Sequence, residues 1–131
     1  GQQTAPITGE PITLEDLAWL QQVNNEVYVD RSIKRYAVDI VATTRGGGPK
    51  PVPGIGRHIR VGASPRGSIA LMRIAQAIAL QDGRGFVTPE DVKLMRHAVL
   101  RHRLVRTFDA LADNISPETL VDAAVAAVPT P

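Results

Sequence analysis

The sequence of 131 residues contains no cysteine, few aromatic residues and no long apolar run. Without cysteine, disulfides, thiolate zinc sites and cysteine nucleophiles are excluded, and a reducing compartment is the natural expectation. No apolar stretch approaches the roughly 20 residues that span a bilayer, and the opening GQQTAPITGEP lacks a signal-peptide pattern. We therefore expect a cytoplasmic chain with no membrane partner. Because aromatic residues make up only 4% of the sequence, the core must consist mainly of aliphatic side chains, which suits packed helices.

A chain of this length accommodates one domain with a sizeable core. We assign residues 12–131 to that domain and interpret the polar residues 1–11 as a linker or a cloning remnant. Helix-start signals recur along the domain, each followed by apolar residues at helical spacing. They are the capping-box pairs Thr13 with Asp16 and Thr88 with Asp91, the N-cap residue Asp30, and the cap-proline pairs Ser64-Pro65, Thr88-Pro89 and Ser116-Pro117.

These signals predict an all-α fold, a small helical bundle with at most tiny extended segments. The helix after Asp30 should bury one face, formed by Ile33, Ala37, Ile40, Val41 and Thr44. It stops at RGGGPKPVPGIG, a Gly/Pro segment in which we expect no regular structure.

The helix after Ser64 should bury Ile69, Leu71 or Met72, Ala75, Ile78 and Ala79, and Gly83 can take the left-handed conformation that ends it. The helix after Thr88 should run to about Arg103. Short extended pieces are expected at 59–61 and 86–87. The scattered aromatic side chains are expected in the core: Trp19, Tyr28, Tyr36, Phe86 and Phe108.

The basic residues are mostly arginine and cluster between Arg57 and Arg106, although the formal net charge is only +2. This asymmetry indicates a phosphate-bearing or acidic partner, but a solvated helix face explains most single arginines equally well. Arg66 has a sharper argument, because VGASPRGS places it in the first turn of a helix with Ser64 as the N-cap and Pro65 at the first helical position. A cation there costs about 0.3 to 1 kcal/mol unless an anion compensates.

Several kinds of catalytic site are absent from the sequence. His97 and His102 are five residues apart on one predicted helix, so they do not face a common metal ion, and no metal ligands are predicted. Ser64 and Ser68 have no suggested His/Asp partners. The segments GGGPK and GIGRHIRVG lack the spacing of a phosphate-binding loop. Alone, this chain should not hydrolyse ATP, and most of any phosphate site must come from another domain.

Three segments, taken in order, resemble the C-terminal lid of the MoxR family of AAA+ ATPases. They are VYVDRSIKRYAVDIVATTR, GASPRGSIALMRIAQAIALQDGRGFVTPEDVKLMRHAVLRHRL and ALADNISPETLVDAAVAAVPTP. The resemblance extends over roughly Ile12 to Pro131. GASPR, VTPEDV and VLRHRL at these distances form a specific combination.

The resemblance implies that Arg66 is the sensor-2 arginine, a catalytic residue that contacts the terminal phosphates of ATP. It implies that Gly62, Ala63, Ser64 and Pro65 form the nucleotide-binding turn with Arg66, although for Ala63 a tight packing turn is an equal alternative. ATP with Mg²⁺ would be bound in the full-length protein, where an upstream core with the Walker motifs holds the Mg²⁺. The resemblance further implies a ring-forming homo-oligomer with chaperone-like activity and partner proteins with von Willebrand A domains.

One residue departs from the family pattern, since the family often has alanine after this arginine. Gly67 stands there and weakens helix propensity in the first turn by about 0.5 to 1 kcal/mol.

Two alternatives belong to other functional classes. An arginine-rich helical nucleic-acid-binding module would fit the basic cluster, but the scarcity of aromatic residues for base stacking argues against it, and we expect no nucleic-acid partner. A purely structural interaction domain would pair Arg66 with an internal carboxylate such as Asp30 or Asp39.

Overall fold

The computed structural model describes residues 11–131, so all but Pro11 of the predicted linker lies outside the described part. The elements are α1 (Leu14–Asn25), α2 (Arg31–Thr44), α3 (Ile55–His58), β1 (Ile59–Val61), α4 (Pro65–Gln81), α5 (Pro89–Leu94), α6 (Arg96–Leu100), the 3₁₀ turn η1 (Arg101–Arg103), β2 (Val105–Arg106), α7 (Phe108–Ala112) and α8 (Pro117–Ala127). The prediction of a small all-α bundle with tiny extended segments is confirmed.

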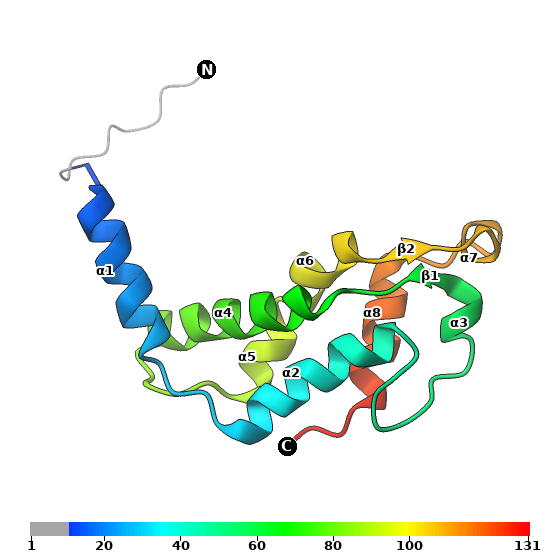
Figure 1. Ribbon diagram of the computed structural model, residues 1–131, viewed down its shortest axis with the longest axis horizontal. Coiled ribbons are helices and arrows are strands. Elements are labelled where there is room, and N and C mark those ends of the chain that lie inside the picture. The colour runs from blue at the N-terminus through cyan, green and yellow to red at the C-terminus, as the bar shows by residue number, and fades with distance from the viewer. Residues whose placement is uncertain (1–10) are drawn as a thin grey trace.

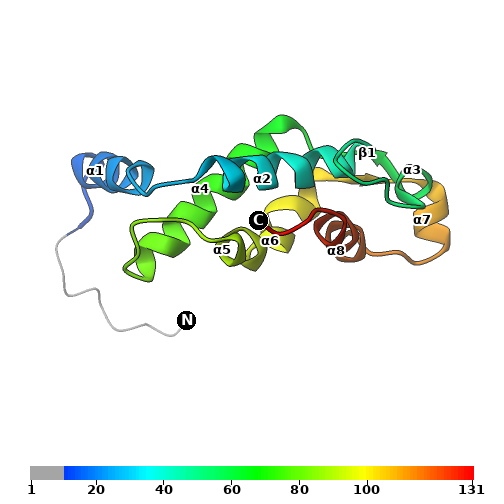
Figure 2. The same ribbon diagram turned by 90° about the horizontal axis from the view of Figure 1, so that it is seen from below.

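Helices α2 and α4 pack together and form the long axis of the bundle (Figure 1). Helix α8 packs against α2 and α6, and α5 packs against α4 (Figure 2). Helix α1 projects from one end and contacts α4. The opposite end carries α3, α7 and the two-stranded antiparallel sheet, in which Ile59 of β1 pairs with Arg106 of β2. No helix among residues 11–131 is both long and apolar enough to cross a membrane.

The core lies between α2 and α4 and is closed by α8. All of the α2 residues predicted to be buried are buried: Ile33, Ala37, Ile40, Val41 and Thr44. On α4 the buried stripe runs through Leu71, Ala75 and Ala79, whereas Ile69 is exposed, so that part of the predicted face is wrong. The small alanines allow the two helix backbones to approach closely.

Most of the predicted helix caps are confirmed. Both capping boxes form, Asp30 accepts from the N–H of Ser32, and Gly83 has φ +74°. The prediction that the Ser64 hydroxyl caps α4 is wrong, although Ser64 does occupy the N-cap position. The carbonyl of Ser64 accepts the Gly67 N–H at 2.8 Å. A serine hydroxyl at the N-cap usually accepts from the N–H of the second or third helical residue. Here the N–H of Gly67, the third helical residue, donates to the Ser64 carbonyl and not to the hydroxyl.

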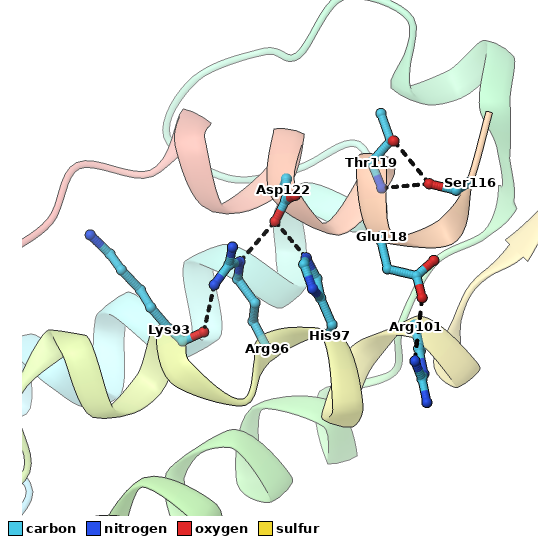
Figure 3. Close-up of polar contacts among 8 residues, drawn as sticks. All are labelled: Lys93, Arg96, His97, Arg101, Ser116, Glu118, Thr119 and Asp122. Atoms are coloured by element: carbon cyan, nitrogen blue, oxygen red, sulfur yellow. Dashed lines mark hydrogen bonds and ion pairs between the residues drawn. The ribbon is translucent and has the colours of Figure 1, made fainter.

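The helix predicted to run from Thr88 to about Arg103 is interrupted at Met95, whose φ and ψ are −108° and 21°. After the break, Nε of Arg96 donates to Asp122 of α8 at 2.8 Å and Nε2 of His97 lies 2.6 Å from the same oxygen (Figure 3). Nη1 of Arg96 donates to the Lys93 carbonyl at 2.9 Å. The Arg96 and His97 contacts thus join the start of α6 to α8. The Gly/Pro segment also departs from expectation, because α3 begins within it at Ile55.

The prediction that the aromatic side chains fill the core is mostly wrong. Tyr36 is 2% exposed, but Trp19 is 62% and Phe108 is 87% exposed. Tyr28 and Phe86 are also exposed and lie in an isolated β-bridge. Closely packed helices with small core residues leave little volume for further aromatic rings, which therefore remain on peripheral elements.

Candidate functional site

The candidate turn, Gly62 to Arg66, connects β1 to α4 and lies against the C-terminal end of α2. The close approach of Gly62 to α2 leaves no room for a side chain at this position, because a Cβ atom on it would lie 2.4 Å from the Thr44 carbonyl oxygen. The side chain of Ala63 is fully buried, so in this conformation its contribution is packing. Ser64, Pro65 and Arg66 are exposed. The turn therefore has a fixed base and an exposed tip.

Arg66 lies in the first turn of α4, a helix of 17 residues whose first turn contains no acidic residue and no side-chain cap. Within residues 11–131 the structure shows no side-chain hydrogen bond or ion pair of Arg66. The alternative in which Arg66 pairs with Asp30 or Asp39 is not supported, because neither of these described carboxylates forms an ion pair with it. The Asp30 carboxylate instead accepts from Ser32 and from the Tyr28 hydroxyl. A guanidinium at the positive end of a helix, free of carboxylates, is suited to bind an anion.

Most other arginines of the basic cluster are already bound within the fold. Ion pairs link Arg57 to Asp109 and Asp113, Arg84 to Asp82 and Asp91, Arg96 to Asp122, and Arg101 to Glu118. The Arg103 and Arg106 side chains donate to backbone carbonyls. Among the arginines from Arg57 to Arg106, all of which the structure describes, Arg60, Arg66 and Arg73 lack such a partner for their side chains. This internal pairing weakens the case for a nucleic-acid-binding surface, which needs unpaired cations.

Two hollows lie near these elements. One of about 340 Å³ borders the candidate turn and is lined by Arg45, Arg60 and Gly62 among others. The other, about 560 Å³, lies between α1 and α4.

No group of three or more potential metal ligands occurs in the described residues. His97 contacts Asp122 and His102 accepts from Arg101, so the two histidines serve different partners.

Asp91 has a second role that the sequence did not reveal. Besides capping α5, its carboxylate receives two hydrogen bonds from the guanidinium of Arg84, at 2.7 and 2.8 Å. Asp91 is 5% exposed, and the Arg84 guanidinium lowers the pKa of its carboxyl below the usual value. The acidic residue of the capping box was visible in the sequence, but nothing there indicated its basic partner.

Comparison with known proteins places the chain in a family. A model of the AAA lid domain matches residues 55–124. Chaperone MoxR1 of Mycobacterium tuberculosis is 36% identical over 98% of this chain and 34% of its own length. Protein MoxR of Paracoccus denitrificans is 31% identical over 83% of this chain and 34% of its own length. The crystal structure of an ATPase candidate from Cytophaga hutchinsonii superposes with a TM-score of 0.80 and 27% identity, covering 89% of this chain and 36% of that one.

The chain thus spans about a third of the length of these relatives. The matched lid model, the relatives and the shared fold agree with the motifs GASPR, VTPEDV and VLRHRL. The chain belongs to the AAA lid domain family and is the lid of a MoxR-type AAA+ protein.

Proposed function

We propose that this lid supplies Arg66 to the terminal phosphates of ATP, which is bound mainly by an AAA+ core elsewhere in the full-length protein. The observation that carries the proposal is the exposed Arg66 guanidinium in an acid-free first turn, with no ion-pair partner in residues 11–131. Retaining a cation at this helix end costs about 0.3 to 1 kcal/mol without an anion. An approaching phosphate would remove that cost.

Each residue of the turn has a distinct part in this proposal. The Arg66 guanidinium offers forked donors to phosphate oxygens and would stabilise the charge that develops during phosphoryl transfer. Gly62 and Ala63 hold the base of the turn against α2. Ser64 and Pro65 lie at its exposed tip, and the Ser64 hydroxyl is free of a capping role. We assign Mg²⁺ to the core, because the described residues contain no cluster of acidic or histidine ligands for it.

At the level of the whole protein, we propose that the lid closes over ATP and that its rotation relays hydrolysis around a ring of identical subunits in the cytoplasm. A relative is named a chaperone, which supports a role in assembling or activating client proteins. Proteins with von Willebrand A domains are the proposed partners.

The test is steady-state ATP hydrolysis by the full-length protein with Arg66→Ala. We expect turnover to fall about a hundredfold, equivalent to about 2.7 kcal/mol of transition-state stabilisation, while nucleotide still binds. Arg73→Ala is the matched control, because Arg73 is also exposed on α4 and lacks a side-chain partner within residues 11–131. Unchanged turnover in Arg66→Ala, or an equal loss in both variants, would contradict the proposal.

A further inference from the structure

The turn that carries Arg66 is attached to α2 by hydrogen bonds from two consecutive residues. The N–H of Ala63 donates to the Thr44 hydroxyl at 3.0 Å, and that hydroxyl donates to the Val41 carbonyl at 2.6 Å. Nη1 of Arg45 donates to the Ala63 carbonyl at 3.3 Å. Both polar groups of the Ala63 backbone are thus bound by side chains at the C-terminal end of α2.

The hydrogen bond to Thr44 is shielded from water. Thr44 is 1% exposed and Ala63 is fully buried, so water has little access to replace the bond if the hydroxyl is removed. Gly62 lies against the backbone of Thr44 so closely that no other side chain fits without displacement. The α2 end and the turn therefore form one packed unit.

Little freedom remains between Ala63 and Arg66. Pro65 fixes its own φ, and the Gly67 N–H closes the first turn on the Ser64 carbonyl at 2.8 Å. Holding the Ala63 peptide therefore sets where α4 begins and where the Arg66 side chain leaves it.

We propose that Thr44 and Arg45 are positioning residues that hold the Ala63 peptide so that Arg66 reaches the phosphates; this inference rests on the function proposed above for Arg66. Thr44 and Arg45 touch no nucleotide in this proposal. The C-terminal end of α2 thereby contributes to the discrimination between ATP and ADP, because Arg66 contacts the terminal phosphate of ATP only when its side chain is correctly positioned.

The test uses the full-length protein with Thr44→Val, which keeps the shape but removes the hydroxyl, and Thr44→Ser, which keeps the hydroxyl. Thr43→Val is the matched control, since Thr43 is also 1% exposed but its hydroxyl bonds within α2, to the Asp39 carbonyl. Arg45→Met tests the second contact, and the unfolding midpoint shows whether this substitution at an exposed position affects the fold. We compare dissociation constants for ATP and ADP, unfolding midpoints, and hydrogen–deuterium exchange of peptides that contain Ala63.

We expect Thr44→Val to speed exchange at Ala63 and to reduce the preference for ATP over ADP several-fold, in the direction of Arg66→Ala. Arg45→Met should do the same to a smaller extent, whereas Thr44→Ser and Thr43→Val should leave the ATP preference within about twofold. In an Arg66→Ala background, Thr44→Val should cause no further loss of preference, because residues acting through one another are not additive.

Unchanged exchange at Ala63 in Thr44→Val would overturn the attachment itself. If Thr44→Val reduced the preference for ATP equally in the presence and in the absence of Arg66, Thr44 would not act through Arg66. An equal reduction in Thr43→Val would also overturn the proposed positioning role. If Arg66→Ala leaves the ATP preference unchanged while Ala63 exchange rises in Thr44→Val, the function proposed for Arg66 fails. The nucleotide part of this inference fails with it, and only the attachment stands.

Discussion

Arg84 and Asp91 form a bidentate ion pair that connects the segment between α4 and α5 to the first turn of α5. Nη1 and Nη2 of Arg84 lie 2.8 and 2.7 Å from the two Asp91 carboxylate oxygens. The same carboxylate accepts from the Thr88 N–H at 2.8 Å. Since Asp91 is 5% exposed, these donors replace its lost hydration.

Asp91→Asn should lower the free energy of unfolding by roughly 1.5 to 3 kcal/mol, the range for hydrogen bonds to charged groups. Urea unfolding of the chain measures this. Asp109→Asn is the control, because its exposed carboxylate lies 3.6 Å from Arg57 and should leave the unfolding curve nearly unchanged. Similar losses of unfolding free energy in the two variants would contradict the conclusion that burial makes the Arg84–Asp91 pair more important for stability than an exposed pair.

The effect of Asp91→Asn should depend on pH. Because the folded state lowers the pKa of the Asp91 carboxyl, the pair stabilises the fold above the unfolded pKa of about 3.9. That stabilisation is lost as the pH falls through the folded pKa. The difference between wild type and Asp91→Asn should therefore shrink in acid; a difference that stays constant from neutral pH to acid would exclude this linkage.

The carboxyl of Asp30 should titrate far below a normal aspartate. The Ser32 hydroxyl and N–H and the Tyr28 hydroxyl donate to it, which lowers its pKa to about 2. Its contribution to stability is present above the unfolded pKa of about 3.9 and is lost as the pH falls through about 2. Carbon-13 NMR titration of the side-chain carboxyl measures the value. Ser32→Ala should raise the pKa, and an ordinary aspartate pKa in the wild type would refute the assigned contacts.

Two glycines near the candidate turn should respond oppositely to alanine. A Cβ on Gly67 would lie 3.4 Å from both Ala63 and Leu100 side-chain atoms, which is ordinary contact, so Gly67→Ala should stabilise the chain by about 0.5 to 1 kcal/mol through helix propensity. A Cβ on Gly62 would lie 2.4 Å from the Thr44 carbonyl oxygen, so Gly62→Ala should destabilise it by about 1 to 3 kcal/mol. Thermal unfolding distinguishes the two, and shifts of the same sign would contradict the packing described.

Features encoded by neighbouring residues were predictable from the sequence, and features that depend on distant partners were not. The cap at Asp30 and the buried face of α2 follow from short-range pattern, and the structure has both. The residue after the break at Met95 donates to Asp122 of another helix, and the second role of Asp91 needs Arg84 as its partner. For the site, the sequence located Arg66 in a first helical turn, but the attachment of that turn to Thr44 depends on packing between segments 19 residues apart.

The fluorescence of Trp19 reports how closely α1 packs against the rest of the bundle, because Trp19 lies on α1 and is the single tryptophan of the chain. It is 62% exposed and α1 buries no residue, so Trp19 fluorescence should be strongly quenched by acrylamide in the folded state. It should also change little on unfolding, while far-ultraviolet circular dichroism reports the loss of helix. Amides of α1 should exchange faster than those of α4, because few apolar contacts oppose local opening. A Trp19 shielded at low protein concentration would show that α1 packs more tightly than described, whereas shielding that grows with concentration would place α1 in a contact between chains.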